Sequence, residues 1–262
     1  MSTTTVSDST LSMGTVASQT FGSIGRNIVT FGVLAFLAAV PQQVLFFYLN
    51  RATATGLRAG PTALTTVVGG SFAVLIASVF LSYLLYAAIV YGTIVDLNGQ
   101  RASFGRCIGA AFRVFLPLVG LSIISTIGIA IGFVLLIVPG IILALGWCVA
   151  VPVRVVERTS IFDALSRSWS LTSGYKGTIF LLWLVFVIGA AIFGAVGLAF
   201  AGTMSFLHPG PPTSLPIFYF LYQGVVRGLE SMVGAAGAAA VYYQLRVIKE
   251  GVGAEQLAAV FD

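Results

Sequence analysis

Five long stretches of this chain contain no Asp, Glu, Lys or Arg, and they constrain its fold more than any other feature. They cover residues 27–50, 61–95, 114–153, 177–226 and 231–245. A helix needs about 20 apolar residues to cross a bilayer, so stretches of this kind are typical of transmembrane helices. Only 8% of the residues are charged and 58% are hydrophobic, which excludes a soluble domain with a charged surface. We therefore expect an all-α, polytopic integral membrane protein.

Two of these stretches are too long for one crossing and are interrupted by residues that break helices. In the stretch 114–153, Pro139 lacks an amide donor and Gly140 tolerates a sharp turn, so we expect a tight hairpin there. The proline-rich segment 205–216 divides the stretch 177–226 in the same way. The sequence therefore predicts six transmembrane helices, at residues 27–49, 65–95, 114–138, 140–156, 177–203 and 217–247.

Three shorter segments, 20–28, 103–115 and 160–173, combine basic and apolar residues at helical spacing. Each precedes an outward-going span, namely spans 1, 3 and 5. We expect each to be an amphipathic helix that lies on the cytoplasmic membrane surface.

The segment 160–173 shows this pattern most clearly. On a helix, Phe162 and Trp169 fall on one side, whereas Asp163 and Arg167 fall on the other. Ser160 three residues before Asp163 is typical of a helix start, and tryptophan is favoured at the level of the lipid headgroups. The apolar side also contains Ile161, Leu165 and Ser168, and the polar side Ser166 and Ser170.

The basic residues indicate the orientation of the chain. If both termini are cytoplasmic, ten of the 13 Lys and Arg residues lie on the inner side, and only Arg51, Arg58 and Arg227 on the outer side. The positive-inside rule favours this arrangement. We expect a disordered cytoplasmic tail at 1–20, a six-helix membrane domain at 21–250 and a second cytoplasmic tail at 251–262.

The run from residue 136 to 177 resembles a bacterial membrane-protein family. That family includes the membrane domain of some glycerophosphoryl diester phosphodiesterases and free-standing, largely uncharacterised relatives. The segment "VYYQLRVIKEG", residues 241–251, is similar to the tyrosine-rich exit from the last span of that family. The resemblance implies a six-helix domain of the bacterial inner membrane and implies little about activity. The matching residues are Pro139, Gly140, Pro152, Glu157, Ala164, Arg167, Ser168, Leu171 and Gly174.

A group of charges follows the short fourth span. Its 14 uncharged residues, 140–153, reach about 21 Å as a helix, less than the hydrocarbon core of roughly 30 Å. Arg154 and Glu157 must therefore snorkel or pair, and Arg158 and Arg167 are also within reach of Glu157. We favour a structural latch between the amphipathic helix and span four. A site that gates a path or binds a lipid headgroup is the alternative.

Arg227 and Glu230 form a second charged pair, spaced three residues apart in the last span. If the helix is continuous from residue 217, the pair lies within the membrane, where ionisable residues are candidates for function. If the chain instead turns inward near Gly228, the pair lies at the outer boundary. The small residues at 234–240 would allow close helix packing, either internal or between copies of the chain.

Three classes of function remain. We expect a non-catalytic membrane protein that organises lipid, or a membrane-protein partner or second copy, through its surface helices. A transporter or channel that uses Arg227, Glu230, Gln42 and Gln43 is the alternative, and a lipid-processing enzyme is third. Catalytic, phosphate-binding and metal-ligand patterns are missing from the aqueous segments, where the single His208 lacks suitable neighbours, so we expect no enzyme, cofactor or metal. The charge distribution also excludes nucleic acid.

Overall fold

The structure is a computed structural model that describes residues 10–59, 61–207 and 217–251. The loop with His208, residues 1–9 of the first predicted tail and residues 252–262 of the second lie outside these residues, whereas residues 13–20 of the first tail belong to a helix. Within the described residues every regular element is a helix, which confirms the all-α prediction. The helices are α1 (Met13–Arg26), α2 (Ile28–Ala59), α3 (Pro61–Leu97), α4 (Phe104–Leu135), α5 (Ile137–Gly146), α6 (Ala150–Glu157), α7 (Ile161–Thr172), α8 (Lys176–Leu207) and α9 (Ile217–Glu250).

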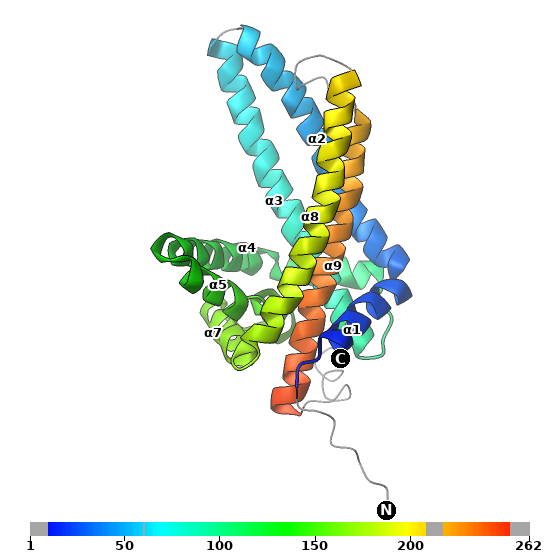
Figure 1. The fold of residues 1–262 in the computed structure, drawn as a ribbon, viewed down its shortest axis with the longest axis vertical. Coiled ribbons are helices and arrows are strands. Elements are labelled where there is room, and N and C mark those ends of the chain that lie inside the picture. Colours follow the sequence, from blue (N-terminus) through cyan, green and yellow to red (C-terminus); the bar gives the residue numbers. More distant parts are fainter. Residues whose placement is uncertain (1–9, 60, 208–216, 252–262) are drawn as a thin grey trace, which may run out of the picture.

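Four long helices, α2, α3, α8 and α9, form a column along the longest axis of the molecule (Figure 1). Helices α1 and α7 lie at the lower end of this column, and the hairpin of α4 and α5 projects from its side (Figure 1). Helix α9 lies against α1, α2 and α3, whereas α8 contacts mainly α9 and α5. The lower half of the column therefore holds most of the packing, and α8 stands at its margin.

Five segments are long and apolar enough to cross a membrane. They are Ile28–Leu49, Gly69–Leu97, Phe104–Leu135, Ile137–Glu157 and Lys176–Phe200. Helix α9, the expected sixth span, is not among them because its centre consists of weakly apolar Gly and Ala and it also carries charges and tyrosines. It is instead the most enclosed of the long helices, with Ala235, Ala236, Ala239, Ala240 and Tyr242 all fully buried.

The turn between the third and fourth spans lies earlier than Pro139 and Gly140, where we expected it. Leu136, in an extended conformation, separates α4 from α5, and Pro139 is already the third residue of α5. The prediction was wrong by three residues because a proline in the first helical turn removes an amide that has no partner there anyway. The fourth span is also divided, since α5 ends at Gly146 and α6 begins at Ala150.

The segment 103–115 does not form a separate surface helix. It is continuous with the apolar part of α4, which runs unbroken from Phe104 to Leu135. In contrast, α1 is separated from α2 by Asn27, and α7 is a separate helix with the expected start. The Ser160 hydroxyl accepts the amide of Asp163 at 3.2 Å, and Gly174 at the other end has a φ of +89°.

The core lies where α2, α3, α4 and α9 meet near the lower end of the column. Phe31, Ile89, Leu118 and Tyr242 are among its fully buried side chains. Gly92 is required at this meeting point, because a Cβ there would lie 2.7 Å from the Phe31 ring and 3.0 Å from the Cys107 sulfur.

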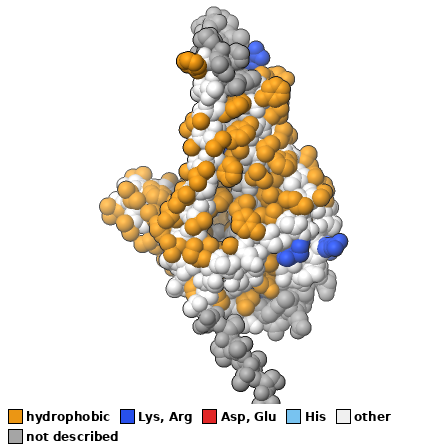
Figure 2. Space-filling view, turned by 45° about the vertical axis from the view of Figure 1, so that its right-hand side comes forward, with side chains coloured by type: hydrophobic (Ala, Val, Ile, Leu, Met, Phe, Trp, Pro, Cys, Tyr) orange, Lys and Arg blue, Asp and Glu red, His pale blue; other side chains and the backbone are white. Residues whose placement is uncertain are grey.

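Large apolar side chains also cover the outside of the molecule. At the tip of the α4 and α5 hairpin, Val134 is 86% exposed and its neighbours Leu135 and Leu136 are exposed to a similar extent. Hydrophobic side chains cover most of the face shown in Figure 2, with Lys and Arg only near its upper and lower ends. A surface of this kind matches the hydrocarbon of a bilayer rather than water.

Candidate functional site

Glu157 lies at the centre of a charge cluster at the lower end of the column. Its carboxylate accepts a hydrogen bond from Arg167 Nε at 3.1 Å and another from the Tyr242 hydroxyl at 2.9 Å. Arg167 also pairs with Glu250, which in turn accepts from Arg246 Nε at 2.9 Å. We call Glu157, Arg167, Tyr242, Arg246 and Glu250 the inner charge cluster. It joins the ends of α6, α7 and α9.

Of the four charges expected in the latch, the structure brings together only Glu157 and Arg167. Arg158 is exposed and has a φ of +52°, so the chain reverses there and carries α7 back across the end of α6. The Nε and Nη1 atoms of Arg154 are buried and have no hydrogen-bond partner among the described residues. Glu157 therefore pairs with a residue ten positions away rather than with its helical neighbours.

Sequence reasoning missed the partners that α9 supplies. Tyr242, Arg246 and Glu250 are spaced four residues apart, which puts them on one face of a helix, and this signal was present in "VYYQLRVIKEG". Lys249 adds a further link, because its Nζ donates to the carbonyl oxygens of Ser170 at 2.5 Å and Ser173 at 2.8 Å. These carbonyls end α7, where the helix dipole also favours a cation.

The Trp169 side chain is half-exposed, so part of its ring contacts the protein and the rest faces outward. Its ring packs against Gly146, where a Cβ would collide with it, and the ammonium group of Lys176 lies 3.3 Å from the ring centroid. The hydroxyl of Ser168 donates to the Gly146 carbonyl at 2.8 Å. Helix α7 therefore packs against the break between α5 and α6, and the Trp169 ring covers that break.

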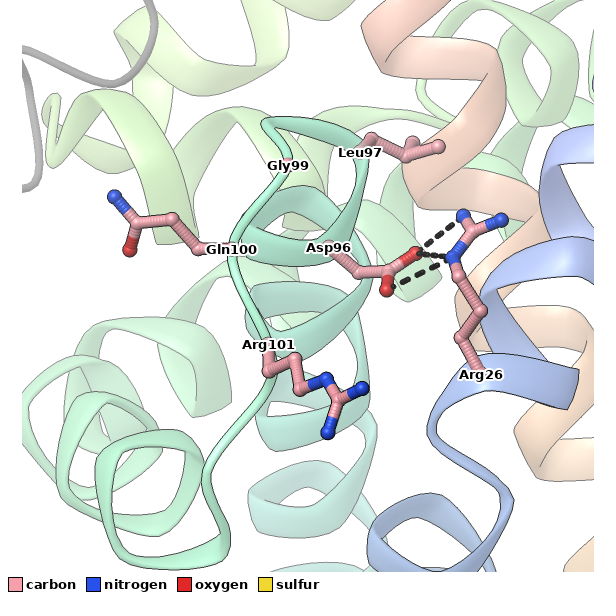
Figure 3. Close-up of a pocket in the computed structure, with 6 residues that line it drawn as sticks. All are labelled: Arg26, Asp96, Leu97, Gly99, Gln100 and Arg101. Atoms are coloured by element: carbon pink, nitrogen blue, oxygen red, sulfur yellow. Dashed lines mark hydrogen bonds and ion pairs between the residues drawn. The ribbon is translucent and has the colours of Figure 1, made fainter.

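A second polar cluster joins the end of α1 to the end of α3 (Figure 3). The Asp96 side chain is only 4% exposed, and it pairs with Arg26 Nη2 at 2.6 Å. Asn27 donates to the same carboxylate at 2.6 Å and accepts the amide of Ala102 at 3.2 Å. Gly99, Gln100 and Arg101 border a cavity of about 480 Å³ beside this pair. Sequence analysis missed Asp96, although a lone acid directly before an Asn-Gly turn is a usable signal.

Electrostatics supports the charged state of both clusters. The hydrogen bond to Asp96 raises the pKa of Arg26 above its ordinary value. Burial alone would raise the pKa of Glu250, but hydrogen bonds from Arg246 and Arg167 outweigh it and lower that pKa. Glu250 therefore remains ionised at neutral pH. Among the described residues, no group of three His, Cys, Asp or Glu side chains could hold a metal ion.

Arg227 and Glu230 pair with each other on α9, with Arg227 Nη1 and Glu230 Oε2 3.2 Å apart. The helix is continuous from Ile217 to Glu250, so the chain does not turn inward at Gly228. Tyr222, one turn before Arg227, stacks beside Phe200 at the end of the apolar part of α8.

The pair lines the upper part of a cavity of about 1270 Å³ between α1, α2, α8 and α9. We call this space the α8–α9 groove. Gln42 and Gln43 of α2 line it as well, so the four polar residues singled out in the sequence border the same space.

The profile of an uncharacterised protein family, UPF0259, matches residues 62–209. A UPF0259 membrane protein of Pectobacterium carotovorum subsp. carotovorum (strain PC1) is 32% identical to the chain over 105 residues. The matched part spans 40% of this chain and 40% of that relative, so less than half of the relative's length is covered. No solved structure matches the chain.

Proposed function

We propose that this chain, which belongs to the UPF0259 family of uncharacterised proteins, has a non-catalytic role in the bacterial inner membrane. In this role its cytoplasmic end organises lipid or a membrane-protein partner. The observation that carries the proposal is the position of α1 and α7, which lie on opposite sides of the column at the same end of the long helices (Figure 1). Both direct large apolar side chains outward, since Phe21 is 61% and Phe162 is 71% exposed.

The outward apolar side chains of α1 and α7 support contact with lipid. Burying a phenylalanine in an apolar phase contributes about 2 kcal/mol, and α1 and α7 together present Phe21, Phe162 and Trp169. The same end carries Arg26, Lys176 and the inner charge cluster, which can meet anionic headgroups. Helices with outward apolar residues beside basic ones are typical of elements that lie in the membrane interface.

We infer six crossings, with α9 as the sixth. Its 34 residues extend about 51 Å, which exceeds the roughly 30 Å of the hydrocarbon core. Because α2 and α3 shield it, it does not need the strongly apolar surface of a lipid-facing helix. Six crossings put α1 and the end of α9 on the same side, and the distribution of basic residues favours the cytoplasm. The resemblance to the membrane domain of glycerophosphoryl diester phosphodiesterases supports the same architecture.

The proposal is tested by purification in mild detergent with quantification of bound phospholipid and co-purified protein. The variant Phe162→Ser removes an outward side chain of α7, and Phe218→Ser removes one at the opposite end of the column. Both phenylalanines are 71% exposed, so they form a matched pair. We expect Phe162→Ser to lower bound lipid or partner about twofold and Phe218→Ser to leave both unchanged. Equal effects of the two variants would contradict a specialised cytoplasmic end.

A transporter is the second candidate, because Arg227, Glu230, Gln42 and Gln43 border one cavity. A solute path needs several polar side chains along its length, as in known transporters with sites at mid-membrane. Here the polar residues gather in the upper part of a largely apolar space. The lipid role therefore has the stronger support.

A further inference from the structure

The α8–α9 groove extends along several turns of both helices. On α9 its lining extends from Val226 to Val241, and on α8 from Ile179 to Phe193. At 1.5 Å per residue these distances are about 22 Å and about 21 Å along the two helices. One leaflet of a bilayer contributes about 15 Å of hydrocarbon. The groove thus spans more than the depth of one leaflet.

The lining is almost entirely uncharged. Its two charged residues, Arg227 and Glu230, neutralise each other at 3.2 Å. Beside them, the hydroxyl of Ser82 lies 3.5 Å from Gln42 Oε1, so this amide also has a partner within the protein. An occupant would therefore meet apolar carbon over most of its length and no unpaired charge, which favours a hydrocarbon chain.

Small residues keep the groove wide. Gly189 of α8 and Gly234, Gly237 and Ala238 of α9 face into it. A Cβ at Gly189 would meet nothing within 4 Å, and one at Gly237 would approach only Thr20, at 3.9 Å. Helix α8 makes most of its contacts with α9 and α5, so the α2 side of the groove is not packed closely against α8. The volume remains open in the folded chain.

The lower end of the groove is bordered by α1, at the level assigned above to the membrane interface. Val16, Ala17, Thr20 and Phe21 line it there. Lys176, one turn before the lining residue Ile179, begins α8 at the same end. A lipid whose chain enters the groove at α1 would therefore keep its headgroup close to a basic surface.

We propose that the α8–α9 groove binds one acyl chain of a phospholipid from the cytoplasmic leaflet. The proposal deepens the lipid-organising role and rests on it. An extended hydrocarbon chain is much thinner than a helix, which is about 10 Å wide, and it needs no polar partner along the largely apolar lining. A transmembrane helix of a partner is the competing occupant, and the experiment below distinguishes the two.

The test uses two glycines of α8 that differ in whether they line the groove. A Cβ meets nothing within 4 Å at either Gly189 or Gly194, but only Gly189 lines the cavity. Leucine at either position improves helix propensity equally. The full chain is purified from cells, exchanged extensively into mild detergent and measured by native mass spectrometry. We expect the wild type and Gly194→Leu to retain one phospholipid, and Gly189→Leu to lose most of it.

A second pair keeps the test informative if Gly189→Leu does not fold. Ala190 lines the groove and its neighbour Ala191 is exposed, so Ala190→Phe should release the lipid and Ala191→Phe should not. Equal lipid retention in Gly189→Leu and Gly194→Leu would overturn the acyl-chain site. So would recovery of a polypeptide or a second copy of the chain in place of lipid. The Phe162→Ser comparison depends on the surface helices alone, so its outcome separates failure of this site from failure of the lipid role.

Discussion

Removing the Glu157 carboxylate should destabilise the protein more than removing any exposed charge near it. The side chain is 17% exposed, and its two partners come from α7 and α9. The substitution Glu157→Ala removes the acceptor of the Tyr242 hydroxyl, which is fully buried as a residue, and one of the two acids that pair with Arg167. Three helix ends would lose their common link.

The two contacts contribute unequally. A hydrogen bond to a charged group contributes about 1.5–3 kcal/mol when it is sheltered, which applies to Tyr242. The pair with Arg167 contributes less than about 1 kcal/mol, because Arg167 is 33% exposed and keeps Glu250 as a partner. We expect a loss of about 2–3 kcal/mol for Glu157→Ala and about 1 kcal/mol for Glu157→Gln, which keeps an acceptor. At roughly 2–4 °C per kcal/mol, Glu157→Ala should lower Tm by about 4–12 °C.

The chain carries its own reporters for this measurement. Cys107 is buried and Cys148 is half-buried, so a thiol-reactive dye will label them as the protein unfolds on heating in detergent. Arg113→Gln is the control, because it removes an exposed charge from α4 and should change stability by less than about 0.5 kcal/mol. A double-mutant cycle with Tyr242→Phe should show a coupling of about 1–2 kcal/mol. If Glu157→Ala melts together with Arg113→Gln, the cluster does not hold these helices.

Three further predictions use the same preparation. Asp96→Asn should lower the melting temperature by several degrees, because it removes the charge that pairs with Arg26; an unchanged melting temperature would contradict a structural role for this pair. In liposomes we expect no proton flux from the wild type or from Glu230→Gln, and a wild-type flux that Glu230→Gln abolishes would favour transport instead. Folding lowers the pKa of Glu250 below its ordinary value of 4.5. The ion pairs of Glu250 therefore stabilise the protein fully at a pH above 4.5, and this stabilisation is lost as the pH falls through the lowered pKa. Thermal stability should therefore fall in acid below about that pH, and Glu250→Gln, measured alongside, should lack that part of the loss.

The sequence allowed prediction of features that depend on one helix at a time. Apolar length predicted the five segments that can cross a membrane, and the spacing of Ser160 and Asp163 predicted the start of α7, because both signals arise within a few residues. The hairpin turn was misplaced because Pro139 fits the first turn of a helix as well as it fits a break. The local sequence does not distinguish these two positions, and the choice of Leu136 depends on how α4 and α5 pack.

The pairing of charges could not be predicted because it depends on where the chain reverses. The sequence offered Arg154, Arg158 and Arg167 as partners of Glu157 and did not distinguish among them. The left-handed conformation of Arg158 turns the chain so that α7 brings Arg167 to Glu157. The approach of α9, which supplies Tyr242, follows from the packing of three helices and leaves no trace in the residues around Glu157. Long-range contacts of this type require the fold itself.

Helix α9 is the least apolar of the long helices because its neighbours, rather than lipid, surround much of it. Apolarity along a membrane helix reflects contact with lipid, and a helix enclosed by its neighbours is free to carry other residues. On α9 the buried alanines pack inward, while Gly234, Gly237 and Ala238 leave the adjacent face hollow. The inner charge cluster fixes the lower end of the same helix. The wall of the groove is therefore anchored at the end of the column where α1 and α7 lie. If the groove holds a lipid chain as proposed, that chain would stabilise the contact between α8 and α9 that the protein alone leaves incomplete.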